Sequence, residues 1–214
     1  MIILGLTGSI GMGKSTAAGM LRNLGVPLFD ADETVHRLLA AGGAGVRPVA
    51  AAFPGVETKA GNIDRAALGR LVFADPAALK RLEAILHPMV AAEEKRFLAR
   101  ARARRERLAV LDIPLLFETG AERRCDYVLV VSAPAAVQRQ RVLRRPGMTE
   151  IRLASILQKQ IPDHEKRRRA DFVVPTGGGR HLTLRHLRAI VTLLRGRNAR
   201  FAGGSRRVPR LRGK

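Results

Sequence analysis

Short apolar runs recur along the chain and alternate with stretches of helical periodicity. The run from Met1 to Leu6 is nearly continuous, as expected of a strand buried on both faces of a parallel sheet. Apolar residues then follow a helical spacing over 14–24, and Gly25 ends that predicted helix. Strands that alternate with helices predict βαβ units, and therefore a three-layer parallel α/β fold. Further strands are predicted at 26–29, 107–113, 127–132 and 172–174, and further helices at about 134–144, 149–160 and 182–194.

The middle of the chain is mostly helical, from Glu33 to about Ala103, with two glycine-containing breaks. Pro76 opens one predicted helix, and His87-Pro88 separates that helix from the next. We therefore predict one domain over residues 1–195 that carries a helical lobe at about residues 33–103.

Composition places the chain among soluble intracellular proteins. Hydrophobic residues make up 46% of the sequence, which is enough to build a core. The one cysteine, Cys125, excludes an internal disulfide and suits a reducing compartment, where we expect it to pack as a small apolar residue. No apolar run approaches the roughly 18 residues of a membrane span, and Met1–Leu6 is too short for an export signal. We therefore expect a cytoplasmic location.

The charge balance favours polyanionic partners. There are 39 basic and 18 acidic residues, giving a net charge of +21. Nucleotides, coenzymes, nucleic acids and anionic membrane surfaces all remain candidates. From Arg195 onward the chain has eight basic residues and no acidic one, and we predict a disordered basic tail at 196–214. Without the residues from Arg195 onward the net charge is still +13, so the predicted folded part is itself basic.

Residues 8–15, Gly-Ser-Ile-Gly-Met-Gly-Lys-Ser, fit the phosphate-binding pattern G-x-x-x-x-G-K-[ST] between a predicted strand and a predicted helix. Glycines let the backbone wrap a phosphate chain, and the helix N-terminus adds partial positive charge. Lys14 is placed to reach the β- and γ-phosphates, and the Ser15 hydroxyl to ligate Mg²⁺. The pattern predicts a P-loop that binds ATP and magnesium. Its predicted nucleotide-binding residues are Gly11, Met12, Gly13, Lys14, Ser15 and Thr16.

Three carboxylates follow predicted strands, at the sheet edge where parallel α/β proteins bind ligands. Asp30 and Asp32 follow the second strand, where either could deprotonate an acceptor hydroxyl. Asp32 could also cap the helix that begins at Glu33. Asp112 ends an apolar strand, as the magnesium-binding carboxylate of P-loop proteins does. We predict Asp32 as the catalytic base and Asp112 as a metal ligand.

Four arginines gather at the end of one predicted helix and in the Pro-Gly turn after it. Cations beside a glycine hinge are typical of a lid that closes on phosphates and stabilises transition-state charge. We predict a lid at about residues 139–168, in which at least one of these arginines is a catalytic cation. The four residues are Arg139, Arg141, Arg144 and Arg145.

The motifs together resemble the dephospho-coenzyme A kinase family over about residues 1–190. The matching segments are Leu4–Thr16, Asp30–His36, His87-Pro88, Pro114–Glu118, Gln138-x-x-Arg141, Gln160 and Lys166–Val173. This resemblance implies a nucleoside-monophosphate-kinase-like fold, and transfer of the ATP γ-phosphoryl group to the ribose 3′-hydroxyl of dephospho-CoA, the last step of coenzyme A synthesis. It makes Asp32 the base, places Arg141 in the lid as a catalytic cation, and assigns residues 33–103 to substrate binding. It also assigns His87, Leu115, Leu116, Phe117 and Glu118 to the acceptor site.

One segment departs from that family's pattern. Many members have an asparagine-containing turn after the last strand, whereas this chain has Pro175-Thr-Gly-Gly-Gly179. The contacts to adenine therefore stay open, with the Pro-Thr-Gly backbone amides as candidates.

Two other functions compete with this interpretation. Another small P-loop kinase, acting on a nucleoside monophosphate or a small alcohol, would share the P-loop but would not account for Pro114–Glu118. A nucleic-acid-binding protein would account for the net charge of +21, but aromatic residues are only 4% of the chain, too few for a platform on which bases stack. We therefore expect dephospho-CoA as the substrate and no dedicated nucleic-acid partner.

Overall fold

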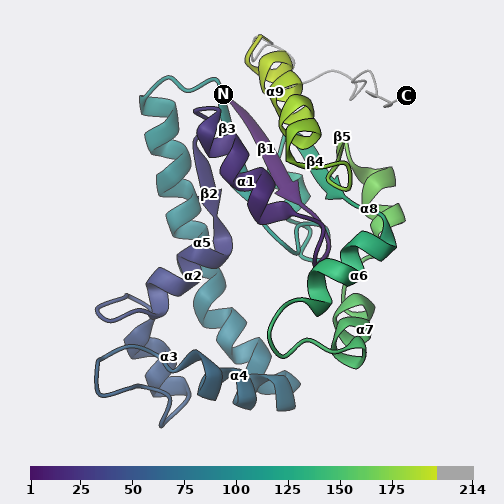
Figure 1. Cartoon of the computed structure of the whole chain (residues 1–214). Coiled ribbons are helices and arrows are strands. Elements are labelled where there is room, and N and C mark those ends of the chain that lie inside the picture. The colour runs from purple at the N-terminus through teal and green to yellow at the C-terminus, as the bar shows by residue number, and fades with distance from the viewer. Residues whose placement is uncertain (197–214) are drawn as a thin grey trace. The chain divides into compact units, whose positions relative to one another are not determined.

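The computed structural model of the protein describes residues 1–196, apart from the side chains of Phe73 and Ala74. Five strands form one sheet in the order β2-β3-β1-β4-β5 (Figure 1). Each of the pairs β1–β3, β1–β4 and β4–β5 is parallel. The predicted parallel α/β fold is therefore confirmed. The strands are β1 Ile2–Thr7, β2 Leu28–Asp30, β3 Leu108–Asp112, β4 Tyr127–Ser132 and β5 Phe172–Pro175.

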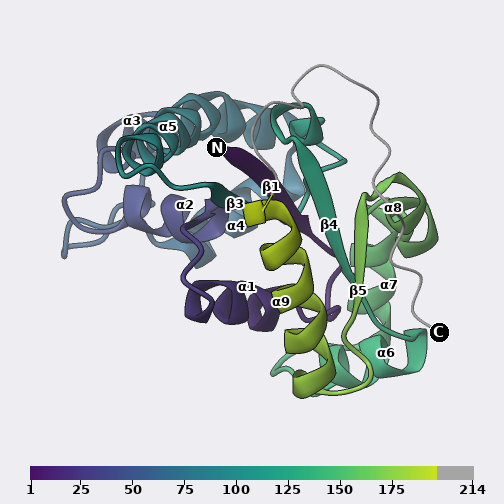
Figure 2. The same ribbon diagram turned by 90° about the horizontal axis from the view of Figure 1, so that it is seen from above.

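Apolar side chains hold α1 (Lys14–Asn23) and α9 (Arg180–Gly196) against one face of the sheet (Figure 2). The core between them includes Leu6 of β1, Leu21 of α1 and Leu187 of α9, none of which is exposed. Strands β3 and β4 are almost wholly buried, which explains why they read as continuous apolar runs. This packing fixes the β1–α1 junction, where the P-loop lies.

Four further helices follow β3 and β4 along the chain. They are the 3₁₀ helix Ala121–Arg124, α6 Ala135–Leu143, α7 Glu150–Gln158 and α8 Asp163–Arg169. Thr149 caps α7 as predicted, because its side chain accepts a hydrogen bond from the Arg152 amide. Cys125 is buried, as expected, with its thiol against Gly5.

The chain divides into two compact units, one made of residues 1–29 and 101–214 and the other of residues 30–100. The second unit is helical and has an apolar core of its own, which includes Leu39, Val49 and Phe53. Asp64 caps one of its helices, and the hydrogen bond from the Ala67 amide lowers the pKa of the Asp64 carboxyl below its ordinary value. Its helices are α2 Ala31–Leu39, α3 Val46–Ala52, α4 Arg65–Ala74 and α5 Pro76–Ala103, the last of which ends in the first unit.

One detail of the helical section was predicted wrongly, and one alternative is excluded. His87-Pro88 does not join two helices, because α5 runs from Pro76 to Ala103 with Pro88 inside it. The packing of neighbours such as Leu86 outweighs the hydrogen bond that proline removes. The alternative role of Asp32 as a helix cap is excluded, because the cap of α2 is Asp30, whose side chain accepts from the Glu33 amide at 3.0 Å.

No helix within residues 1–196 is long and apolar enough to cross a membrane. Of the predicted tail at 196–214, Gly196 belongs to α9, and residues 197–214 lie outside the residues that the structure describes.

Candidate active site

The P-loop connects β1 to α1 in a backbone conformation that two of its glycines make accessible. Gly11 and Gly13 have φ angles of 75° and 87°, which side-chain-bearing residues rarely adopt. The first hydrogen bond of α1 runs from the Ala17 amide to the Gly13 carbonyl. The amides of Lys14, Ser15 and Thr16 therefore have no partner within the helix, and they form the anion-binding end of its dipole.

Lys14 and Asp112 form an ion pair beside this loop. The Lys14 Nζ lies 2.7 Å from the Asp112 Oδ1, and Asp112 is buried at the end of β3. The register between β1 and β3 brings this about, because Leu6 of β1 is the partner of Asp112. The two residues were predicted to serve phosphate and metal, and the structure brings them together.

Arg141 contacts the P-loop backbone from α6. Its guanidinium donates to the Gly11 carbonyl at 3.5 Å, to the Thr176 hydroxyl at 3.2 Å and to the Thr176 carbonyl at 2.7 Å. The Thr176 hydroxyl in turn donates to the Met12 carbonyl at 2.8 Å. These contacts place one predicted lid cation against the loop that is predicted to bind ATP.

The side chain of Thr176 contacts the P-loop, which was not predicted from the sequence, where only its backbone amide was a candidate for adenine. Thr176 follows β5, and its own amide donates to the Ser132 carbonyl at 2.8 Å. Of the amides offered to adenine in the Pro175–Gly179 turn, that of Thr176 is therefore used inside the fold. The sequence shows a threonine in a turn that departs from the family pattern. It does not indicate that this threonine contacts a P-loop residue 164 positions away.

The other three arginines of this cluster are more exposed than Arg141. Arg139 pairs with Glu150 and so connects α6 to α7, whereas Arg144 and Arg145 are exposed. They are available to a ligand, and their part in a lid stays a prediction.

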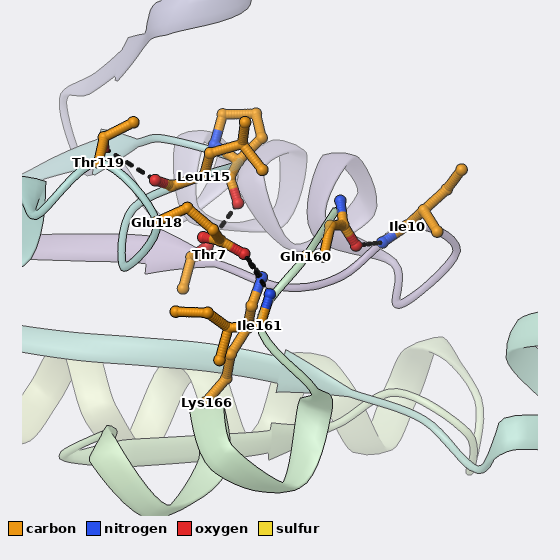
Figure 3. A network of polar contacts seen from close by, with 9 residues as sticks. Thr7, Ile10, Leu115, Glu118, Thr119, Gln160, Ile161 and Lys166 are labelled. Atoms are coloured by element: carbon orange, nitrogen blue, oxygen red, sulfur yellow. Dashed lines mark hydrogen bonds and ion pairs between the residues drawn. The ribbon is translucent and has the colours of Figure 1, made fainter. Parts of the chain in front are cut away.

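The segment Pro114–Glu118 follows β3 and is held from both ends (Figure 3). The Thr7 hydroxyl at the end of β1 donates to the Pro114 carbonyl at 2.9 Å. At the other end, the Glu118 Oε1 accepts from the Ile161 amide at 2.9 Å and lies 2.8 Å from the Lys166 Nζ. Lys166 is fully buried, so its ammonium group is enclosed by protein.

The four predicted acceptor residues of this segment differ in exposure. Leu115 is 41% exposed, whereas Leu116 is fully buried and Phe117 is nearly so. The Glu118 Oε2 is buried and has no hydrogen-bond partner within residues 1–196. Leu115 therefore offers the accessible apolar surface of the segment, and the acceptor role of all four stays a prediction.

Asp32 and His87 belong to the helical unit. Asp32 is exposed in the first turn of α2, and no hydrogen bond or ion pair to its carboxylate is found within residues 1–196. His87 is exposed on α5. Both side chains are accessible to a substrate, which their predicted roles require.

Comparison with known sequences gives the family. The model of the dephospho-CoA kinase family matches residues 2–180. A dephospho-CoA kinase from Paramagnetospirillum magneticum is 63% identical over 210 residues, covering 98% of this chain and 99% of the relative. One from Mesorhizobium japonicum is 59% identical over 196 residues, covering 92% and 98% of the two chains.

Solved structures agree with the sequence relatives. A protein from Thermus thermophilus superposes with a TM-score of 0.76 at 39% identity, over 90% of this chain and 97% of that one. A dephospho-CoA kinase from Campylobacter jejuni gives 0.67 at 25% identity, over 89% and 95%. The resemblance and the P-loop kinase fold predicted from the sequence are therefore confirmed, and the chain belongs to the dephospho-CoA kinase family.

Proposed function

We propose that the protein transfers the γ-phosphoryl group of ATP to the ribose 3′-hydroxyl of dephospho-CoA, giving coenzyme A and ADP. The acceptor oxygen attacks the γ-phosphorus, the bond from that phosphorus to the β–γ bridging oxygen breaks, and ADP leaves. The observation that carries the proposal is a P-loop whose Lys14 meets Asp112 at the sheet edge, in a chain of this family. The predicted cytoplasmic location remains a proposal with it.

Lys14 is the group that changes partner when ATP binds. Its ammonium lies 2.7 Å from Asp112, and the phosphate chain carries more negative charge than one carboxylate. We expect Lys14 to turn toward the β- and γ-phosphates, and this turn would release the Asp112 oxygen. Arg141, already against the Gly11 carbonyl, adds a second cation to the same loop.

Magnesium would be held by Ser15 and Asp112. A hydroxyl and one carboxylate, with phosphate oxygens and water completing the shell, form the donor set that this ion usually takes in kinases. Both donors are present: the Ser15 hydroxyl is exposed at the start of α1, and Asp112 ends the strand next to β1. When bound, the ion neutralises charge that develops on the transferred phosphoryl group.

Asp32 is our candidate for the general base. It is exposed, follows the strand β2 by two residues and is not used as a helix cap, because Asp30 has that role. Its carboxylate would accept the proton of the 3′-hydroxyl as the new oxygen–phosphorus bond forms.

The test is ADP release with Mg-ATP and a panel of acceptors: dephospho-CoA, nucleoside monophosphates and small alcohols, with product mass as the second readout. Turnover confined to dephospho-CoA, with coenzyme A as product, would support the proposal. Turnover only with another acceptor would support a P-loop kinase activity but contradict dephospho-CoA as the substrate. Bound ATP without any turnover would instead favour a binding protein.

A further inference from the structure

Two glutamines from the ends of one segment bind the backbone of the same P-loop residue. The Gln138 Nε2 donates to the Ile10 carbonyl at 2.8 Å, and the Ile10 amide donates to the Gln160 Oε1 at 3.1 Å. Gln138 lies in α6 and Gln160 follows α7 by two residues, so the segment 139–159 joins the two contacts. Figure 3 shows the Gln160 side chain pointing at Ile10.

The chemistry of Ile10 fixes which end of each side-chain amide faces it. A backbone N–H can only donate and a backbone carbonyl can only accept. Gln160 must therefore present its oxygen, and Gln138 must present its NH₂ group. Gln138 therefore acts as a donor to Ile10 and Gln160 as an acceptor from it, and substitutions can distinguish the two roles.

Neighbouring contacts keep both glutamines in place. Gln138 is buried, and a Cβ on Gly11 would lie 3.0 Å from the Gln138 carbonyl oxygen and 2.6 Å from the Val142 Cγ2, so the loop and α6 touch with no space between them. On the other side, the residue after Gln160 is Ile161, whose amide donates to the Glu118 carboxylate at 2.9 Å. Each glutamine is therefore a fixed support for Ile10.

We propose that Gln138 and Gln160 are positioning residues that set the P-loop conformation at Ile10 and couple it to the segment 139–159. They act through the Ile10 backbone, one residue before Gly11, and not by touching substrate. Since displacing reacting groups by about 1 Å can cost about 100-fold in rate, a small shift of this loop should be measurable. The proposal rests on the proposed function where phosphoryl transfer is the readout.

The first arm of the test removes each bond with a side chain of similar shape. Gln138→Met and Gln160→Met are each expected to lower kcat/KM for ATP about 10-fold, with little change in the KM for dephospho-CoA. Hydrogen–deuterium exchange of the Ile10 amide gives a direct readout. It should accelerate in Gln160→Met, which loses the acceptor, and stay slow in Gln138→Met, which keeps it.

The second arm uses glutamate, which accepts hydrogen bonds but cannot donate when ionised. Gln160→Glu keeps its bond from the Ile10 amide, whereas Gln138→Glu cannot bind the Ile10 carbonyl. The two variants add the same charge near the same residue, so we expect Gln160→Glu to retain about 10-fold more kcat/KM for ATP than Gln138→Glu. Gln140→Glu and Gln158→Glu add the same charge at exposed sites of α6 and α7 without a bond to Ile10, and should lower kcat/KM for ATP less than Gln138→Glu does.

Melting temperatures identify any variant that fails to fold, and the methionine variants then carry the test for that position. The proposal is overturned if the two glutamate variants have equal kcat/KM, or if Gln160→Met leaves Ile10 exchange unchanged. If the wild type does not phosphorylate dephospho-CoA, the proposed function fails, while the exchange arm still decides whether Gln160 holds the loop.

Discussion

Asp30 and Asp32 are two residues apart and have different environments. The Asp30 side chain accepts from the Glu33 amide at the start of α2, so its carboxylate has a structural partner. Asp32 is exposed, and within residues 1–196 no hydrogen bond or ion pair engages its side chain. A general base needs a carboxylate that the acceptor hydroxyl can reach, and Asp32 meets that condition better than Asp30.

Replacing these two carboxylates by amides should therefore give different results. Asp32→Asn is expected to lower kcat about 100-fold or more, because loss of a general base typically costs that much, while the Kd for ATP stays close to the wild-type value. Asp30→Asn is the matched control, since asparagine also caps helices well, and its kcat should stay near the wild-type value. Single-turnover kinetics and calorimetry measure the two quantities. A near-normal kcat for Asp32→Asn would remove Asp32 from the role of base.

At the scale of elements, α8 is attached to the segment after β3 by a buried ion pair. Lys166 of α8 is fully buried, and its Nζ lies 2.8 Å from the Glu118 Oε1 without the angles of a hydrogen bond. Glu118 retains 14% side-chain exposure and also accepts from the Ile161 amide. Leaving the lysine unpaired should therefore cost more free energy than leaving the glutamate unpaired.

A double-mutant cycle tests this asymmetry. Glu118→Gln should lower the free energy of unfolding by about 3–5 kcal/mol, because it leaves a buried ammonium without its counter-charge. Lys166→Met should cost less, and the double variant should recover much of the loss, since glutamine still accepts from the Ile161 amide. Denaturant titration gives all three values. The exposed pair Arg139–Glu150 provides the control, where Arg139→Met should change stability by about 1 kcal/mol or less. Additive losses in the cycle would contradict this account.

The sequence predicts elements well where one local pattern dominates. Strand β4 was predicted at its observed bounds, Tyr127–Ser132, because its apolar run is continuous and ends at an alanine-proline step. Helix α8 was missed, since its buried residue is a lysine in a run of charges and no apolar period marks it. Pro88 misled for the opposite reason: a strong local signal is overridden by packing along α5.

The candidate site follows the same logic over longer distances. The P-loop could be predicted because its residues are consecutive, and Asp112 because it ends an apolar strand. The contacts of Thr176 and Gln160 with the P-loop could not, because they join residues 150 or more positions apart. Such partners depend on strand order and helix packing, which a single sequence does not specify.

At the scale of the whole molecule, the net charge of +21 exceeds what one ATP site needs. Residues 197–214 contribute seven basic side chains and no acidic one, yet most of the excess lies in residues 1–196. A field of this sign attracts both ATP and dephospho-CoA and speeds their encounter with the protein. Residues 197–214 lie beyond the 2–180 match to the family. We therefore expect that their positive charge can be removed without loss of catalysis.

A variant that ends at Gly196 should separate the two contributions. We expect its kcat to equal that of the full chain, and its retention on a polyanion such as heparin to be weaker, because seven basic residues are gone. In both proteins, raising the ionic strength from about 0.1 M to about 1 M shortens the Debye length from about 10 Å to about 3 Å, and kcat/KM for dephospho-CoA should fall about 10-fold. Steady-state kinetics at several salt concentrations measures how kcat/KM for dephospho-CoA depends on ionic strength. A large loss of kcat in the shortened chain would mean that residues 197–214 take part in catalysis, whereas equal retention on heparin would assign polyanion binding to residues 1–196 alone.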